Sequence, residues 1–250
     1  MGWKSSLIII ENKEHFTDEE AVLKAIGKGG YTFDKELTLD ACIYPNDGSI
    51  NIGYYNSNMI ISDDYQITTN ALERATSLQL TKEEKGLTSL FPKAEIVSVA
   101  CHSVVNYHGY SLIQNGAKKR LKIISSDTPL IEFGEKMEEE QEIYKTSYSR
   151  DGKNYWKDTY DPEEELTEDQ LMEEFTFGIA KRRLGVSLDK EDGEELLFEK
   201  VLFKKYINTN QAVDVTTTKK HQRKVTWIKY GIIVLILIIL QILKRVIFGS

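Results

Sequence analysis

The chain has 250 residues, of which 28% are charged and 41% hydrophobic, and its formal net charge is −7 at pH 7. This composition excludes a disordered or collagen-like chain, and the length favours one domain or at most two. Residues 219–250 contain seven of the 32 Lys and Arg and none of the 39 acids, so the rest of the chain is strongly acidic. Phosphate binding needs a basic face, and nucleic acid is therefore not expected as a partner.

The first 90 residues contain the patterns of short strands and amphipathic helices. Apolar runs, two of which flank a Pro-Asn-Asp-Gly turn, indicate strands. Capping boxes that begin at Thr17 and Thr81 indicate helices. The expected strands are 5–10, 41–44, 49–54 and 58–62, and the expected helices are 18–26, 72–78 and 81–90.

One later segment contains the clearest hairpin signal. The dipeptide Asn115-Gly116 suits a two-residue type I′ turn, which would join strands at 95–114 and 117–125. This turn predicts a register with Tyr110 opposite Leu121. Side chains alternate across a strand, so three cations of the second strand are expected together on its solvent-facing side. They are Lys118, Arg120 and Lys122.

The segment 132–170 is strongly acidic and contains many aromatic residues. We expect it to be a long excursion with little regular structure. Its charge is explained most simply by solvation, but aromatic anchors inside an acidic rim could also capture a basic protein partner. The candidate binding residues for such a partner are Tyr155 and Trp156.

Two further helices are expected at the end of the body. The first begins at Thr167, has an apolar stripe as far as Leu184, and stops at Gly185; the second is 194–206. Local hairpins and segregated helices together indicate an α+β fold, with a mostly antiparallel sheet and helices packed on it.

The apolar run near the end of the sequence predicts a single C-terminal transmembrane helix at 225–248. The run is apolar on all sides, so it has no polar face with which to lie along a membrane surface. Its uncharged centre is short for a bilayer, but flanking Lys and Arg side chains can extend toward the headgroups. The expected interfacial anchors are Trp227, Tyr230 and Phe248. The alternative is a buried core helix.

Flanking charge sets the expected orientation. Five Lys or Arg closely precede the apolar run and two follow it, which places the N-terminal side in the cytoplasm. The expected organisation is a cytoplasmic domain at 1–206, a basic flexible linker at 207–224 and a tail anchor at 225–248. The predicted location is therefore a membrane, with a single pass and with the lipid bilayer as the partner of the last helix.

Catalytic motifs are not found. The sequence lacks the usual signatures of nucleotide-binding, dinucleotide-binding, serine-hydrolase and zinc-protease sites. The two cysteines have no His at zinc spacing, so no metal site and no cofactor are expected. The remaining candidate is a polar patch of His102, Asn106 and Ser125, for which the alternative is a hydrogen-bonded network in the core. Cys101 cannot use His102 as a base, because neighbours on a strand point to opposite faces.

Short motifs around this patch resemble an uncharacterised bacterial family, a domain of unknown function. The family has a Met-Gly-x-Lys start, a His-Ser-Val-Val-Asn/Asp-aromatic strand, a hairpin with a basic residue, a Ser-Pro-Asp turn and a following Gly-Glu. Here these are Met1–Lys4, His102–Tyr107, Asn115-Gly116 with Arg120, Ser125–Asp127 and Gly134-Glu135. Ser126 stands where the family often has Pro, and most members lack the tail anchor. The resemblance covers most of 1–206 and implies one folded unit without an assigned activity. It marks His102, Asn106, Arg120 and Asp127 as the positions to test.

Two functions remain in view. The first is a non-enzymatic binding or regulatory domain tethered to a membrane. The second is a hydrolase or transferase whose site surrounds His102, Asn106 and Ser125, with Arg120 and Asp127 as further candidates. The sequence favours the first, because it contains no catalytic motif.

Overall fold

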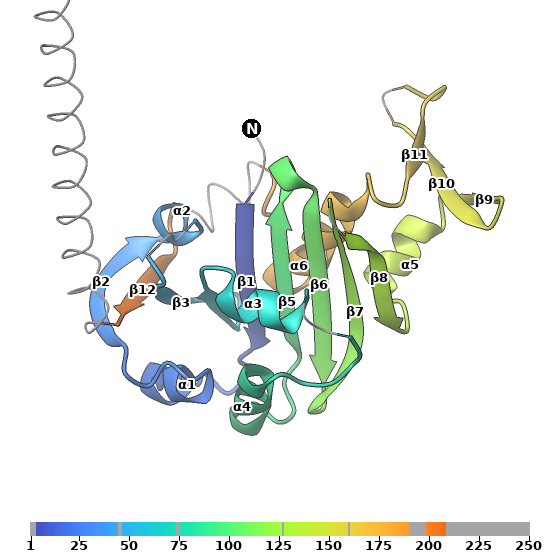
Figure 1. Ribbon diagram of the computed structural model, residues 1–250. Coiled ribbons are helices and arrows are strands. Elements are labelled where there is room, and N and C mark those ends of the chain that lie inside the picture. Colours follow the sequence, from blue (N-terminus) through green and yellow to red (C-terminus); the bar gives the residue numbers. More distant parts are fainter. Residues whose placement is uncertain are drawn as a thin grey trace, which may run out of the picture. The chain divides into compact units, whose positions relative to one another are not determined.

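The computed structural model describes residues 4–44, 47–73, 76–126, 128–159, 161–190 and 199–208. These residues form one large antiparallel sheet, a second small sheet and a few helices (Figure 1). All of the strands and helices named below belong to a compact unit that ends at Ile207.

The large sheet has nine strands in the order β2-β12-β3-β4-β1-β5-β6-β7-β8, and each neighbouring pair is antiparallel. Its strands are β1 (Lys4–Glu11), β2 (Thr32–Thr38), β3 (Ile50–Tyr55), β4 (Asn58–Ser62), β5 (Ile96–His102), β6 (Tyr107–Gln114), β7 (Ala117–Ser125), β8 (Thr128–Gly134) and β12 (Leu202–Ile207). The small sheet has the order β11-β10-β9. Its strands are β9 (Tyr148–Arg150), β10 (Lys153–Lys157) and β11 (Glu165–Thr167).

The helices are short and cover both faces of the large sheet. They are α1 (Glu19–Ala25), α2 (Leu39–Cys42), α3 (Gln66–Ala71), α4 (Lys82–Leu90), α5 (Glu138–Tyr144) and α6 (Met172–Leu184), with a 3₁₀ turn at Ser103–Val105. The central strand β1 shows why both faces need cover. Leu7 and Ile9 belong to one apolar core with Phe175 of α6, whereas Ile8 and Ile10 belong to a second core with residues of α1 and α4. An uninterrupted apolar run is therefore buried on both sides of the sheet.

The expected fold class needs correction. The α+β content is confirmed, but the structure is mainly a nine-stranded sheet with few helices, of which α6 at 13 residues is the longest described. None of the helices in the described part of the chain has the length and apolar character that a membrane crossing requires. The expected helix at 225–248, its anchors Trp227, Tyr230 and Phe248, and almost all of the expected linker at 207–224 lie outside the described residues. The membrane location stays a prediction.

The expected last helix at 194–206 is wrong where the structure describes it. Residues 202–207 form β12, which lies between β2 and β3 in the large sheet. Phe203 is fully buried there, whereas Leu202 is 56% exposed. Two strands from distant parts of the sequence supply the hydrogen bonds for this segment, so tertiary pairing overrides the local helical spacing.

In the first 90 residues, some of the expected strands and helices are confirmed and others are not. Strands at β1, β3 and β4 are confirmed, as is α4 with its capping box of Thr81 and Glu84. The expected strand at 41–44 is wrong, because residues 39–42 form helix α2. The expected helix at 72–78 is wrong where the structure describes it, because the helix of this region is α3, which ends at Ala71. Strand β2 was not expected, because this edge strand is mostly exposed and polar and shows no apolar alternation.

Candidate functional site

The expected long strand at 95–114 is in fact two strands joined by a tight turn. After β5, a 3₁₀ turn and Asn106 reverse the chain, and Asn106 adopts a left-handed backbone with φ of 47°. Asn tolerates this conformation better than most residues. The reversal pairs β5 with β6 and places Cys101 directly opposite His108. Directly opposed residues project to the same face of an antiparallel sheet, so the two side chains are neighbours.

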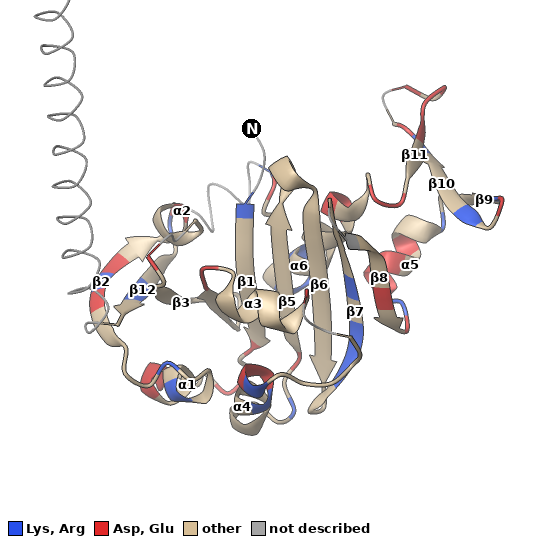
Figure 2. Cartoon of the chain, in the orientation of Figure 1, with Lys and Arg blue, Asp and Glu red and all other residues tan. Residues whose placement is uncertain are grey.

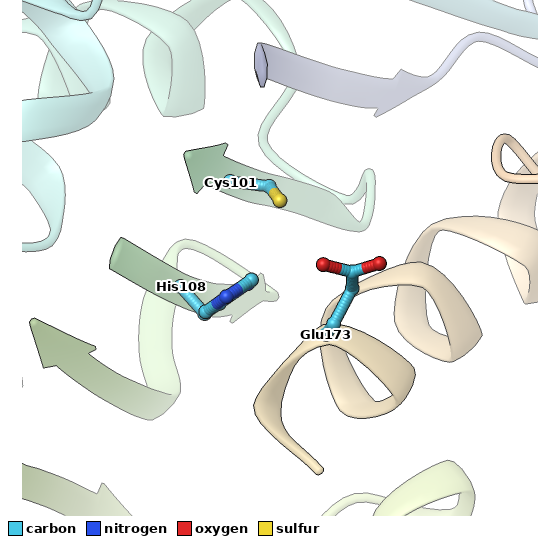
Figure 3. Close-up of side chains that lie close together, drawn as sticks. All are labelled: Cys101, His108 and Glu173. Atoms are coloured by element: carbon cyan, nitrogen blue, oxygen red, sulfur yellow. The ribbon is translucent and has the colours of Figure 1, made fainter. Parts of the chain in front are cut away.

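A third residue completes a compact cluster on this face. Glu173 lies in the first turn of α6, and the side chains of Cys101, His108 and Glu173 point toward one another (Figure 3). One thiol, imidazole or carboxylate atom from each residue lies within 4.8 Å of those of the other two. Cys101 is fully buried, His108 is 4% exposed, and Glu173 is half-buried.

Ser103 holds this cluster together. Its hydroxyl donates a hydrogen bond to Glu173 Oε2 at 2.5 Å, and its Oγ lies 3.5 Å from Cys101 Sγ. The turn after β5 therefore fixes the carboxylate of α6 beside the thiol of β5.

Burial controls the protonation of the cluster. Removal from water raises the pKa of the Cys101 thiol to about 11, because the thiolate is the charged form. Burial also lowers the pKa of His108, although Glu173 acts in the opposite direction. At neutral pH the cluster therefore holds a protonated thiol and a neutral imidazole. A protonated, buried thiol is a poor nucleophile.

The contacts of the described residues do not bring together the three members of the predicted polar patch. His102 pairs with Tyr107, Asn106 is exposed in the turn, and Ser125 pairs with Thr128 at the far end of β7. Within the described ranges, no hydrogen bond joins His102, Asn106 and Ser125 to one another. Cys101 and His102 are neighbours on β5 and point to opposite faces, as expected, whereas the unexpected turn between β5 and β6 brings His108 beside Cys101. Asp127 lies outside the described residues.

A β-bulge changes the register of the hairpin between β6 and β7. Leu112 pairs with Arg120 and Ile113 pairs with Lys118, which leaves Lys119 as the extra residue. Tyr110 consequently faces Lys122 rather than the expected Leu121. One inserted residue turns the two parts of β7 to opposite faces of the sheet.

Gly134 on the neighbouring strand β8 allows the bulge to fit. Its φ is +84°, and a Cβ at this position would lie 1.9 Å from the backbone oxygen of Lys119. A residue with a side chain cannot approach the bulge so closely. The backbone of β8 therefore packs directly against the extra residue of β7.

The cations of β7 are buried, contrary to the expectation that they face solvent. Lys118, Arg120 and Lys122 are all less than 5% exposed. Figure 2 shows Lys and Arg along β7 beside Asp and Glu on β8 and α5. Each cation has a carboxylate partner. Lys118 pairs with Glu84 at 2.9 Å, and Lys122 pairs with Glu168 at 2.6 Å. Arg120 pairs with Glu132 at 2.5 Å and with the fully buried Glu140 at 2.6 Å.

These pairs explain why the prediction failed. The bulge aims Lys118 at α4, while Arg120 and Lys122 point to the face covered by α5 and α6. Arg120 also donates to Glu132 and to the Gly134 carbonyl, so its guanidinium is fully engaged by structural partners. Buried charges are tolerated only when paired in this way. Arg120 is thus placed as an ion-pair residue of the sheet.

The acidic segment 132–170 is more regular than expected, because it contains β8, α5 and the small sheet. Trp156 on β10 is 3% exposed, donates from Nε1 to the Ile143 carbonyl at 2.9 Å, and packs beside Tyr144. Tyr155 points to the other side of the small sheet, where its ring stacks with that of Tyr148 at a centroid separation of 6.1 Å. Trp156 therefore anchors the small sheet to the body, and Tyr155 is the half-exposed member of the pair.

A cavity of about 720 Å³ lies beside the bulge, with a strongly charged lining. Arg182 and Arg183 contribute to it, but both pair with glutamates of the same wall. Small-molecule sites are mostly apolar with few polar groups. This cavity does not have that character.

Comparison with known proteins does not assign the chain to a family. No protein-family model, no curated protein and no solved structure matches the chain. The resemblance to an uncharacterised bacterial family stays a prediction.

Proposed function

We propose that this chain is a binding domain that captures a basic protein segment through its small sheet and the acidic loop after β10. The observation that carries the proposal is the arrangement of Tyr148 and Tyr155. Their stacked rings lie on the side of the small sheet away from the anchoring Trp156. Aromatic side chains with both apolar area and a polar tip are frequent anchors of protein interfaces.

The loop beside these rings supplies the charge. Asp161, Glu163 and Glu164 are exposed, and none of the three forms an ion pair with another described residue. Clustered exposed carboxylates attract cationic partners and speed their encounter. The loop therefore favours a partner with Lys or Arg.

The small sheet already contains one example of the proposed contact. The Arg150 guanidinium lies 4.5 Å from the centre of the Tyr155 ring and pairs with Glu165 at 2.7 Å. A guanidinium held over an aromatic ring and beside a carboxylate gains both cation–π and ionic attraction. An arginine of the partner would find the same two kinds of group at Tyr148 and the acidic loop.

A direct test uses a fluorescein-labelled peptide of alternating Arg and Leu as the probe, with binding followed by fluorescence anisotropy. The double change Glu163→Gln and Glu164→Gln should weaken the affinity about fivefold at low salt, because two exposed ionic contacts contribute about 1 kcal/mol together. The control is Asp34→Asn with Glu36→Gln on the exposed edge strand β2.

The proposal fails if both double variants bind the peptide like the original chain. A Tyr148→Ser change should add a further loss that salt does not remove, since the ring contributes area as well as charge attraction. Trp156→Ala is unsuitable here, because truncating a buried Trp costs about 3 to 5 kcal/mol of stability.

The alternative function, a hydrolase or transferase at His102, Asn106 and Ser125, gains no support from the described contacts. It stays a prediction that His102→Ala would test.

A further inference from the structure

We infer that Cys101, His108 and Glu173 form the binding site for one divalent cation of the zinc class. The site is independent of the proposed peptide-binding surface, since its residues come from β5, β6 and α6. One sulfur, one nitrogen and one oxygen ligand converge in it (Figure 3).

The spacing of the three groups suits a small cation. Their candidate ligand atoms all lie within 4.8 Å of one another. In a tetrahedral zinc site the ligand atoms are roughly 3.5 Å apart, as bond lengths of about 2.0 to 2.3 Å require. A small movement of the Glu173 side chain would close the difference, because Glu173 is half-buried whereas Cys101 and His108 are buried.

His108 supplies the independent sign that a ligand belongs here. Its Nδ1 is buried and has no hydrogen-bond partner among the described residues. An unpaired buried polar atom is costly. His102 Nδ1 shares this condition, but of the two histidines only His108 converges with a thiol and a carboxylate.

Charge balance also favours a divalent cation. A thiolate, a carboxylate and a neutral imidazole together carry two negative charges, which one divalent cation neutralises. A cysteine binds a metal as the thiolate, so uptake of the cation should release the thiol proton to solvent.

The ligand types select the metal. Thiolate and imidazole are preferred by zinc and its neighbours, whereas magnesium and calcium prefer oxygen ligands. Three protein ligands leave a fourth position for water. Ser103, which donates to Glu173, would orient the carboxylate in the way that outer hydrogen bonds orient metal ligands.

Zinc titration of the full chain in competition with a chromophoric chelator is the primary test. We expect one zinc per chain, and we expect Cys101→Ser, His108→Gln and Glu173→Gln each to weaken its affinity more than about 100-fold. The controls are Cys42→Ser, which changes the other buried cysteine, and His102→Gln, which changes a neighbour on the opposite face of β5. Both controls should keep the original affinity.

Two further readouts keep the test decisive. Cobalt should give a thiolate-to-metal charge-transfer band that the Cys101→Ser variant lacks. Zinc should raise the melting temperature of the original chain by roughly 5 °C and leave that of His108→Gln unchanged.

Three outcomes would overturn the inference. They are no zinc bound by the original chain, equal binding by the three ligand variants and the controls, or cobalt binding without the charge-transfer band. If Cys101→Ser does not fold, as judged by circular dichroism, the half-buried Glu173→Gln decides. It must keep the fold and lose the affinity.

Discussion

The cations of β7 and the cluster between β5, β6 and α6 are both polar and buried, but they are satisfied to different degrees. Lys118, Arg120 and Lys122 each have a carboxylate partner at 2.9 Å or less. In the cluster, His108 Nδ1 has no partner among the described residues. A buried charge that is fully paired has a structural role, and no ligand is needed to account for it. An unpaired nitrogen that lies beside a thiol and a carboxylate indicates a metal-binding site.

The largest expected effect would come from breaking a complete pair. Glu140→Gln should lower the free energy of unfolding by about 3 to 5 kcal/mol, because Arg120 would lose its buried carboxylate partner. Urea denaturation measures this loss. The matched control is Glu142→Gln on the same helix, where the side chain is 62% exposed and the change should be below about 0.5 kcal/mol. Equal effects of the two changes would contradict the structural role of the pair.

The bulge that aims these cations should be nearly as sensitive. Gly134→Ala should cost about 3 kcal/mol, since the new Cβ meets the Lys119 backbone oxygen and φ is positive. Gly116→Ala is the control, because this glycine also has positive φ but has open space at the Cβ position, so it should cost about 1 kcal/mol. A smaller loss for Gly134→Ala than for Gly116→Ala would mean that β8 does not support the bulge. Both are measured by urea denaturation.

Cys42 is a buried thiol that belongs to neither region, and its ionisation predicts how stability depends on pH. Burial raises the pKa of Cys42 to about 12, so above pH 9 the unfolded chain ionises this thiol and the folded chain does not. Stability should therefore fall as pH rises from 9, by about 2 kcal/mol at pH 10.5 from this group alone. The Cys42→Ser variant should not show this part of the stability loss when its denaturation midpoints are measured across the same pH range. An identical pH dependence would show that Cys42 is accessible to solvent in the fold.

The smallest change in stability is expected for a residue of the unpaired cluster. His108→Leu in the presence of a strong chelator should change the free energy of unfolding by less than about 1 kcal/mol, because the lost imidazole had an unpaired nitrogen. A loss comparable to that of Glu140→Gln would place His108 among the satisfied structural groups and weaken the case for a metal.

Prediction from the sequence succeeded where local signals were strong. The apolar run of β1, the Asn115-Gly116 turn and the capping box of α4 all lie where the sequence predicts. It failed where distant strands decide the outcome, as in β12, or where one residue changes the geometry, as at Asn106 and Lys119. Periodicity reports local pattern, and neither strand pairing nor a bulge is a local property.

The candidate cluster was harder to predict for the same reason. Cys101 and His108 are brought together by a turn at Asn106, and Glu173 on α6 lies 65 residues after His108 in the chain. A hint was present, because an Asn before a strand pattern favours a left-handed turn. Recognition of that turn would have paired Cys101 with His108, although not with Glu173.

The bulge at Lys119 changes the side of the sheet to which the rest of β7 points. Residues after the bulge face the side opposite to the one that regular alternation would give them. Lys118 therefore pairs with Glu84 of α4, whereas Arg120, two residues later, pairs with Glu140 of α5. If Lys118 or Arg120 were the extra residue instead, that cation would lose its place opposite Ile113 or Leu112 without any change of composition. Sequence changes that preserve every charge can therefore still separate a cation from its carboxylate.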